Sequence, residues 1–351
     1  MVTHLGSKTQ SKGETLELFL TTHFPNLGVT QESAAPVAAL LTRRPDWRLA
    51  VKVITYRRVE WAIDSFASYK SPGAGGIFPA LLQRAQEIVI PYLVRIFRTC
   101  LATSYVPAIW RQMKVVFIPK PGRDSYSGPR DYRPISLTSF LLKTMDRLVD
   151  RYLRDEVLTF MPLHSNQHAY QVGKSVETAL HQLIVRVEKA PDQQEIALGA
   201  FLDIEGTFNS TSYDTMCDAL VRHGSENTIV RWIRATLEGR VAVATLNEFS
   251  LAFAISRGCP QGEVLSPMLW CLVVDDLITR LSRSGIFIQG YADDIRLPAV
   301  GKFPNTVSGL MQWTLSTVEI LCNEVGLSVK LDKTGLVAFT RKRKLQGFFE
   351  P

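Results

Sequence analysis

Two adjacent carboxylates, Asp293 and Asp294, lie between short apolar segments, where the sequence predicts the tip of a β-hairpin. Neighbouring acids repel each other, and a bound cation relieves this repulsion. The pair alone is weak evidence for a cation site, because a solvated turn would carry the same residues. The chain holds a comparable pair, Asp275 and Asp276, at the end of an apolar helical segment with no other chemical signal nearby.

A third acid, Asp203, follows the apolar segment 196–202, which predicts a buried strand with this carboxylate at its end. Together with Asp293 and Asp294 it would supply ligands for two divalent ions about 4 Å apart, the arrangement that promotes in-line phosphoryl displacement. Magnesium suits such a site better than calcium, because substrate phosphates and waters complete its octahedral shell. None of the six histidines has metal-ligand spacing beside these acids, which argues against zinc hydrolysis.

Two further segments have the composition of phosphate-binding elements. The glycine-rich turn 258–262 precedes an apolar helical segment, so its backbone N–H groups are suited to phosphate, and Gln261 to a base or sugar. The loop 120–133 offers cations to a triphosphate or a nucleic-acid backbone. These cations are Lys120, Arg123, Arg130 and Arg133. Each segment alone also has an ordinary explanation, a helix entry for the first and a solvated charged face for the second.

The charge distribution points to a polyanionic partner. The chain has 351 residues, of which 46% are hydrophobic and 21% charged, as expected for a folded protein of one large or two ordinary domains. Residues 1–175 hold 23 basic and 13 acidic side chains, a net charge of +10, whereas the remainder holds 17 and 20, a net charge of −3. The basic first half therefore predicts polyanion binding, especially over 95–154, which has 12 basic and 4 acidic residues.

Cysteine spacing and hydropathy bear on the compartment. The five cysteines show no spacing of a zinc knuckle or redox motif, and their odd number suits no disulfide framework. We expect buried, reduced thiols in an intracellular protein. The polar residues 1–13 lack the apolar stretch of a signal peptide, and no segment is long and apolar enough to span a bilayer, so no membrane partner is expected.

The remaining pattern mixes helices irregularly with short strands, which is typical of an α+β fold rather than a doubly wound parallel sheet. Residues 1–50 predict a loosely attached lead-in. We expect strands over 114–119, 196–204, 240–246, 253–256 and 336–340, with two more about a tight turn over 286–295. We expect helices from near Val59 to the turn at 72–76, and over 81–103, 139–160, 174–190, 213–223, 228–238, 264–284 and 306–325.

The order of seven motifs along the chain closely resembles the reverse transcriptase domain of non-LTR (LINE-type, jockey-like) retrotransposons. The motifs are FIPKPG (117–122), YRPISLTSFLLKTMDRLV (132–149), QHAYQVGKSVETAL (167–180), FLDIEGTF (201–208), GCPQGEVLSP (258–267), YADD (291–294) and GLSVKLDKT (326–334). Upstream, YKSPGAGGI (69–77) resembles the stretch that precedes the fingers in this family. The joint order makes the match specific, although no single motif would.

The resemblance implies a right-hand polymerase with fingers and palm, in which the palm is an antiparallel sheet with packed helices. It divides the chain into the lead-in 1–55, an N-terminal extension with fingers over 56–195, and a palm over 196–351, with the reverse transcriptase domain from about 100 to 351. The activity implied is RNA-directed DNA synthesis, in which a primer 3′-hydroxyl attacks the α-phosphate of a dNTP. The implied cofactor is Mg²⁺, with Mn²⁺ as the alternative, and the implied partners are RNA template, DNA primer and dNTPs, with no obligate protein partner.

The same resemblance implies four catalytic residues. Asp203 takes the place of the first metal-binding aspartate, and Asp293 and Asp294 take the place of the pair on the palm hairpin. Lys333 resembles the palm lysine proposed to protonate the leaving pyrophosphate.

For substrate binding, the resemblance implies that Phe208 excludes a ribose 2′-hydroxyl. Gln261, with Gly262 in the same turn, matches the residue that lies against the incoming nucleotide and template. Lys120 and Arg133 look like the fingers residues that grip the triphosphate.

The chain also departs from the family pattern. Glu263 stands where a small residue usually follows the glycine-rich turn, and Lys330-Leu331 replaces the usual Asn-Pro. Pro298 falls in the segment after the acidic turn, where the family has an apolar strand. With no thumb region before the chain stops at Pro351, the pattern predicts a truncated copy that polymerises poorly, with Glu263 repelling the triphosphate.

Three alternatives remain open from the residues. The same fold could bind RNA without polymerising, as an inactive remnant. The chain could instead be a related polymerase, such as a group II intron protein or telomerase, although the wording of the motifs favours the retrotransposon. A purely structural module would need neither the three acids nor the glycine-rich turn.

Overall fold

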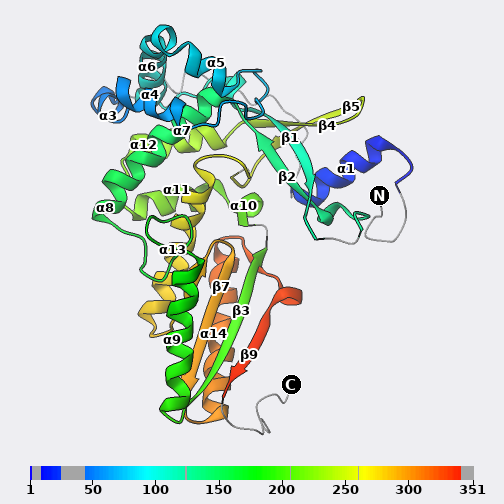
Figure 1. The fold of residues 1–351 in the computed structure, drawn as a ribbon, viewed down its shortest axis with the longest axis vertical. Helices are drawn as coiled ribbons and strands as arrows, with labels where there is room; N and C mark the ends of the chain where they lie inside the picture. The colour runs from blue at the N-terminus through cyan, green and yellow to red at the C-terminus, as the bar shows by residue number, and fades with distance from the viewer. Residues whose placement is uncertain (2–8, 25–43, 123–124, 206, 260, 341–351) are drawn as a thin grey trace. The chain divides into compact units, whose positions relative to one another are not determined.

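A computed structural model describes residues 1, 9–24, 44–122, 125–205, 207–259 and 261–340 (Figure 1). The contacts divide the chain into two compact units: unit 1 comprises residues 1–161 and 208–266, and unit 2 comprises 162–207 and 267–351. The chain therefore passes between the units three times. The division inferred from the sequence, into 1–55, 56–195 and 196–351, stays a prediction, and the contact units cut the chain at other positions.

Unit 1 contains a four-stranded sheet in the order β2-β1-β4-β5. β1 pairs antiparallel with β2 and parallel with β4, which pairs antiparallel with β5. The strands are β1 (Gln112–Pro119), β2 (Tyr132–Leu137), β4 (Arg240–Leu246) and β5 (Phe249–Ile255). β2 was not predicted, because Pro134 and its Pro-rich approach resemble a loop. The proline is tolerated since β2 lies at the sheet edge and needs donors on one side only.

Helix α1 (Lys12–His23) packs on this sheet. Ser11 caps the helix by accepting a hydrogen bond from the Glu14 N–H at 3.1 Å. Leu16 and Leu20 are buried with residues of β1, β4 and β5 in one hydrophobic cluster. The expectation of a loosely attached lead-in is therefore wrong for this helix, whose apolar residues lie too close together in sequence to show a clear helical stripe.

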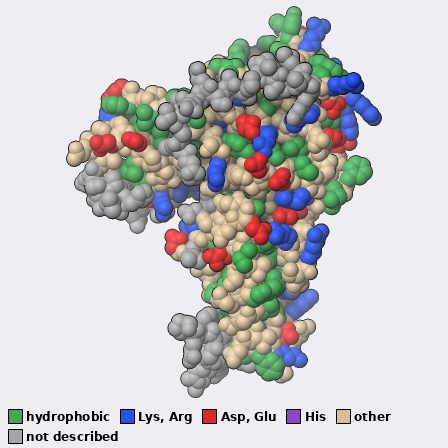
Figure 2. All heavy atoms as spheres, turned by 180° about the vertical axis from the view of Figure 1, so that it is seen from behind, with side chains coloured by type: hydrophobic (Ala, Val, Ile, Leu, Met, Phe, Trp, Pro, Cys, Tyr) green, Lys and Arg blue, Asp and Glu red, His purple; other side chains and the backbone are tan. Residues whose placement is uncertain are grey.

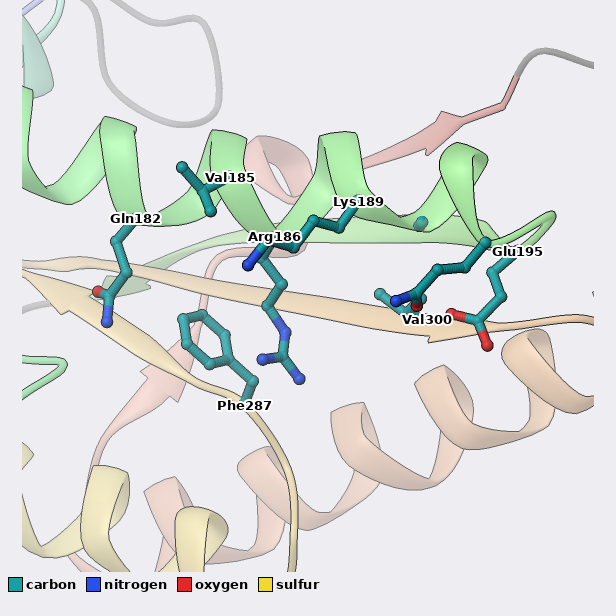
Figure 3. Close-up of a pocket in the computed structure, with 9 residues that line it drawn as sticks. Gln182, Val185, Arg186, Lys189, Glu195, Phe287 and Val300 are labelled. Atoms are coloured by element: carbon teal, nitrogen blue, oxygen red, sulfur yellow. The ribbon is translucent and has the colours of Figure 1, made fainter.

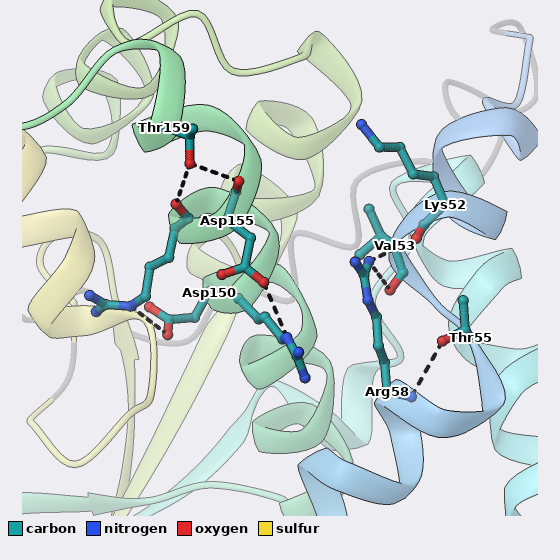
Figure 4. Close-up of polar contacts among 9 residues, drawn as sticks. Lys52, Val53, Thr55, Arg58, Asp150, Asp155 and Thr159 are labelled. Atoms are coloured by element: carbon teal, nitrogen blue, oxygen red, sulfur yellow. Dashed lines mark hydrogen bonds and ion pairs between the residues drawn. The ribbon is translucent and has the colours of Figure 1, made fainter. Parts of the chain in front are cut away.

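Helices form the rest of unit 1. One or two helices around Pro91 were predicted over 81–103. The structure has two, α5 (Pro79–Arg84) and α6 (Gln86–Thr103), which meet at Ala85, and α6 continues through Pro91. Helices α3 (Trp47–Val53) and α4 (Tyr56–Asp64) meet at a short junction. There the Thr55 hydroxyl accepts a hydrogen bond from the Arg58 N–H, and the Arg58 guanidinium donates to the Lys52 and Val53 carbonyls (Figure 4). The α-helices are α3 (Trp47–Val53), α4 (Tyr56–Asp64), α5 (Pro79–Arg84), α6 (Gln86–Thr103), α7 (Phe140–Tyr152), α8 (Leu158–Phe160), α10 (Thr207–Ser210), α11 (Tyr213–Arg222) and α12 (Asn227–Leu237). Two 3₁₀ turns, Ala108–Trp110 and Pro129–Asp131, and a π-helical turn, Leu153–Val157, complete them.

The basic face of α7 and the turn after it is built into the packing of unit 1. Lys143 lies 5.0 Å from the Phe140 ring centroid, and Arg151 lies 4.5 Å from that of Trp61. Arg154 pairs with Asp150 at 3.0 Å, and Arg151 with Asp155 at 3.2 Å; Figure 4 shows both acids. These cations therefore stabilise the helices, in addition to the role in polyanion binding expected from the sequence.

Unit 2 contains an antiparallel sheet with β3 at its centre (Figure 1). β3 pairs with β7 on one side and with β8 and β9 on the other, and β6 pairs with the outer side of β7. The strands are β3 (Ile196–Glu205), β6 (Gln289–Tyr291), β7 (Asp294–Gly301), β8 (Ser328–Val329) and β9 (Gly335–Phe339). The α-helices are α9 (Val176–Asp192), α13 (Ser266–Arg283) and α14 (Pro304–Glu324), with a 3₁₀ turn at Leu331–Lys333. Leu183 and Val187 of α9 are buried with Ala197 of β3.

Pro298 does not interrupt β7. It pairs with Gly199 of β3, and the strand continues to Gly301. β6 pairs only with residues Asp294–Arg296 of β7 and ends before Pro298. No strand of the described residues therefore needs a backbone N–H from Pro298 on that edge of β7. The concern raised by this departure from the family pattern is therefore removed.

Two smaller expectations can be compared with the structure. All five cysteines are buried as free thiols, as the spacing predicted. No helix in the described part of the chain combines the length and apolar character that crossing a bilayer requires.

We predict that Leu16→Ala lowers the free energy of unfolding by about 2–5 kcal/mol, because it leaves a cavity between α1 and the sheet of unit 1. Urea denaturation measures the loss, and Glu17→Ala, on the exposed side of the same helix, is the control. An unchanged denaturation midpoint for Leu16→Ala would show that α1 is only loosely attached.

Candidate active site

The pairing of β3 with β7 brings the three predicted aspartates together within unit 2. Asp203 lies directly opposite Asp294 in the antiparallel register. Opposed residues in such a pair have Cα atoms about 4.5–5.5 Å apart and side chains on the same face of the sheet. The Ile204 N–H donates to the Asp293 carbonyl at 3.2 Å, so the turn that carries Asp293 is fixed to the end of β3.

The hairpin that carries Asp293 is held from the helix side. Tyr291 pairs with Asp294, leaving a two-residue turn in which Ala292 has a left-handed φ of +54°. The indole N–H of Trp270, on α13, donates a hydrogen bond to the Ala292 carbonyl at 2.7 Å. This hydrogen bond stabilises the strained turn. Gly290 precedes the turn, and a Cβ there would lie 2.8 Å from the Ile278 Cδ1 atom, so α13 packs closely against the strand at this glycine.

The segment after Met161 supports the other edge of β6. The Gly290 N–H donates to the Asn166 carbonyl at 3.0 Å, and the His168 N–H donates to the Gly290 carbonyl at 2.9 Å. This segment also brings Tyr170 near the hairpin: burial, and secondarily the Asp293 charge, raise the pKa of Tyr170. Tyr170 was not predicted as a site residue, although it lies in the motif over 167–180.

Two lysines contact Asp203. Lys333 Nζ lies 2.7 Å from Asp203 Oδ2, and Lys330 Nζ lies 3.7 Å from the same oxygen. The hydrogen bond to Asp203 raises the pKa of Lys333. The resemblance implied that Lys333 donates a proton to pyrophosphate, with the alternative that it only offsets charge, and Lys330 was not among the predicted site residues. In the structure both ammonium groups lie beside the Asp203 carboxylate.

The charges around Asp294 favour its neutral form. Burial raises the pKa of this carboxyl, and the neighbouring Asp293 and Asp203 carboxylates raise it further, while Arg296 and Lys333 oppose the shift. A cation bound between these carboxylates would offset their mutual repulsion.

The donor set suits Mg²⁺ in its chemistry. All three side chains offer carboxylate oxygens, which this hard cation prefers, and Mg²⁺ commonly takes one or two carboxylates and completes its shell with water and substrate phosphate. Among the described residues, no three His, Cys, Asp or Glu side chains lie close enough together to hold one ion by themselves. The fit to Mg²⁺ therefore rests on the chemistry of the carboxylate oxygens, with water and substrate phosphate as the further ligands.

Within unit 1, the glycine-rich turn packs against β2. The Ser136 N–H of β2 donates to the Gln261 carbonyl at 2.9 Å, and a Cβ on Gly262 would lie 3.0 Å from the Ser136 carbonyl oxygen. Gly262 also has a φ of +102°, which other residues rarely adopt. The turn is therefore fixed beside the strand that carries Arg133.

The predicted fingers cations lie on the β1–β2 hairpin. Ile118 pairs with Arg133, which is exposed. Lys120, just after β1, donates from Nζ to the Arg130 carbonyl at 2.7 Å and from its N–H to the Asp131 carbonyl at 2.8 Å. Arg123 lies outside the described residues.

Phe208 lies on α10, in unit 1 with the glycine-rich turn. The Cys259 N–H donates to the Phe208 carbonyl at 2.6 Å, and a Cβ on Gly258 would lie 2.5 Å from that oxygen. Phe208 and Gln261 are thus positioned by one set of backbone contacts. Asp203 belongs to unit 2, so the predicted proximity of Phe208 to the aspartates stays a prediction.

Glu263 is buried rather than exposed beside the turn. Its carboxylate pairs with Arg240 at 2.8 Å, and both side chains are only 3% exposed. Arg240 also donates to the Thr236 carbonyl. The expectation that Glu263 repels the triphosphate is therefore wrong, because its charge is matched by Arg240, and no sequence pattern connects these two residues.

The buried pair has two further charged neighbours on α7. Burial, and then the Glu263 charge, raise the pKa of Asp146 well above its usual range. Burial lowers the pKa of Lys143, while Glu263 and Asp146 oppose this shift. These four groups link α7, β4 and the glycine-rich turn within unit 1.

A cavity in unit 2 lies near the opposite end of β3 from Asp203 (Figure 3). Its volume is about 470 Å³, and Arg186 and Lys189 of α9 line it together with Glu195 and Phe287. The Arg186 guanidinium lies 4.4 Å from the Phe287 ring centroid. None of the predicted site residues lines this cavity.

The sheet of unit 2, with an acidic hairpin opposite an aspartate on the central strand, has the architecture of a polymerase palm. The chain belongs to the reverse transcriptase (RNA-dependent DNA polymerase) family, which matches residues 118–348. This match falls within the segment 100–351 that the sequence predicted.

Relatives from mobile elements are similar to most of the chain. The probable RNA-directed DNA polymerase from transposon BS of Drosophila melanogaster is 29% identical, over 84% of this chain and 33% of that protein. The RNA-directed DNA polymerase from mobile element jockey of the same species is 23% identical, over 84% of this chain and 32% of that protein. The resemblance to reverse transcriptases of non-LTR retrotransposons is confirmed. The chain spans about a third of the length of these relatives.

A solved structure shares the fold. The telomerase from Candida tropicalis, in complex with a fragment of telomeric RNA, aligns with a TM-score of 0.50 over 72% of this chain and 45% of that chain. The identity is 13%, so the likeness shows the fold alone. The predicted α+β fold with polymerase fingers and palm is confirmed.

We predict that Glu263→Gly destabilises the protein by roughly 3–5 kcal/mol, because it leaves the Arg240 charge buried without its partner. The free energy of unfolding in urea measures the loss. The double variant Glu263→Met/Arg240→Met is the matched control and should recover much of the stability, since it removes both charges. A Glu263→Gly protein as stable as the unaltered chain would contradict the pairing.

We also predict that Asp294→Asn stabilises the protein at neutral pH. The raised pKa of Asp294 contributes stability that is present below the unfolded pKa and is lost as pH rises through the folded pKa. The advantage of the variant should therefore grow between about pH 4 and pH 7. Urea midpoints across this range measure it, with Asp218→Asn, an exposed acid, as the control. A pH-independent difference would argue against the repulsion.

Proposed function

We propose that this chain forms the polymerising part of a reverse transcriptase, which extends a DNA primer on an RNA template. The observation that carries the proposal is the position of Asp203 opposite Asp294, with Asp293 in the adjoining turn. Family membership supports RNA as the template and dNTPs as the substrates. We further propose that unit 2 acts as the palm, and that the β1–β2 hairpin of unit 1 acts as part of the fingers.

The aspartates would hold Mg²⁺, with Mn²⁺ as the alternative. Bound there, Mg²⁺ would stabilise negative charge on the attacking and leaving oxygens of the displacement. The carboxylates of Asp203, Asp293 and Asp294 would hold the metal ion at the end of β3. The β3–β7 register fixes the backbone there. Lys333, whose ammonium group lies 2.7 Å from Asp203, would donate a proton to the pyrophosphate as it leaves.

Unit 1 would bind the incoming nucleotide. Arg133 and Lys120 would contact the triphosphate. Both residues lie at the β1–β2 hairpin, and Arg133 is exposed. Gln261 and Gly262 would contact the nucleotide through a turn held by β2. Phe208 would exclude the 2′-hydroxyl by its bulk, and its backbone is tied to the same turn.

Nucleic-acid binding would rest on separate cations rather than on one uniform patch. On the face drawn in Figure 2, Lys and Arg side chains are interspersed with Asp and Glu. Several cations of α7 also have structural partners. We expect the number of released counterions, and thus the salt dependence of RNA affinity, to follow the phosphates actually contacted rather than the net charge.

We predict that the purified chain extends oligo(dT) on poly(rA) in the presence of Mg²⁺ and dTTP. The poor polymerisation expected from the sequence loses the support of Glu263, which is buried with Arg240. Asp294→Asn should reduce the rate by at least about a hundredfold, because a metal contributes several kcal/mol to such a step. Asp276→Asn, also in unit 2, is the matched control and should leave the rate unchanged. Binding of the RNA without extension would favour the alternative of an inactive RNA-binding protein of the same fold.

We predict that Phe208→Val relaxes discrimination against ribonucleotides, because the smaller side chain leaves room for a 2′-hydroxyl. The measurement is the ratio of kcat/KM for dTTP and UTP, and Phe208→Tyr, which keeps the ring, is the control. An unchanged ratio in Phe208→Val would refute this role.

A further inference from the structure

The segment that carries Lys330 and Lys333 is folded back onto the end of β3. Ile204 and Glu205 pair with the two residues of β8. The Lys330 N–H donates to the Asp203 carbonyl at 2.9 Å, and the Thr334 hydroxyl donates to the Lys330 carbonyl at 2.8 Å. Backbone contacts therefore keep both lysine stems beside Asp203.

The two ammonium groups lie beside the same carboxylate oxygen. Asp203 Oδ2 has Lys333 Nζ at 2.7 Å and Lys330 Nζ at 3.7 Å, and the Asp203 side chain is only 14% exposed. The Lys333 side chain is 57% exposed and the Lys330 side chain 28%, so Lys333 has more room to move away.

We propose that Lys330 and Lys333 form a latch on Asp203 that competes with a divalent cation for this carboxylate. The inference rests on the proposed function, in which Asp203 is a metal ligand. An ammonium group at Oδ2 takes the oxygen that a cation would use, and both positive charges repel a cation that approaches. The cation therefore binds Asp203 only as Lys333 withdraws, while the tethered Lys330 keeps its charge nearby.

The latch gives the site a preference for metal bound to nucleotide over free metal. The triphosphate of a metal–nucleotide complex offers anionic oxygens that can accept the two ammonium groups while the metal takes Asp203. Free metal brings no such replacement partner. Lys330 deepens this preference in a position where the family pattern has a neutral residue.

Binding of free Mn²⁺ tests the latch without any catalytic turnover. The electron paramagnetic resonance signal of unbound Mn²⁺ gives the affinity of the full chain and of Lys333→Met, Lys330→Met and the double variant. Each single change should tighten binding roughly two- to fivefold, the range expected for losing one exposed ion pair. Lys302→Met, an exposed lysine just after β7, is the matched control and should leave the affinity unchanged. Urea midpoints verify that each variant is folded.

Asp203→Asn separates the two possible failures. If Asp203→Asn weakens Mn²⁺ binding but neither lysine substitution tightens it, the latch is refuted and the metal site stands. If Mn²⁺ binding does not depend on Asp203, both the latch and the proposed metal site fall. Tighter binding in Lys330→Met and Lys333→Met, dependent on Asp203, supports the latch.

Discussion

The register of β3 against β7 is the constraint on which the candidate site depends. It sets Asp203 opposite Asp294 and fixes the turn of Asp293 to the end of the central strand. A slip of one residue would turn every side chain of β7 to the other face of the sheet. At the end that carries the aspartates, buried residues alternate with less buried ones on both strands, so their packing also protects the site. Packing energy that has no direct part in chemistry thereby determines where the carboxylates lie.

The same strand end gathers like charges that cost stability. Asp294 has a raised pKa because it is partly buried beside two other acids, and the two lysines on Asp203 offset part of that repulsion. Rigid supports on both sides keep the hairpin in place despite this cost, with the Trp270 hydrogen bond on one side and the backbone of His168 on the other. A cation bound at these carboxylates would relieve the repulsion that folding leaves.

Local patterns in the sequence were enough to predict most elements of the fold. β4 was predicted with its observed bounds, and the acidic hairpin was expected where β6 and β7 meet, because apolar runs and turn residues carry these signals. Helix α1 and strand β2 were missed, since one lacks a clear apolar stripe and the other contains a proline that only an edge position tolerates.

Contacts between distant residues were the part that the sequence could not supply. Glu263 was expected to disturb the site, and only the structure shows Arg240, 23 residues earlier, as its buried partner. Lys330 was noticed as a departure from the family pattern, but its proximity to Asp203 follows from the pairing of β8 with β3. A strand of only two residues has no recognisable sequence pattern, so this pairing was not predicted. The gathering of the three aspartates was predictable only because the hairpin and the strand end each had a recognisable pattern.

If the Asp203 and Asp294 carboxylates interact across the β3–β7 pair, a double-mutant cycle will detect their coupling. The free energies of unfolding of Asp203→Asn, Asp294→Asn and the double variant are compared with that of the unaltered chain at neutral pH. Because either neutralisation alone relieves the repulsion between the two acids, we expect the double variant to be less stable than the sum of the single effects, with a coupling of at least about 0.5 kcal/mol. Strict additivity would show that the two carboxylates do not interact, and would contradict this account of the site.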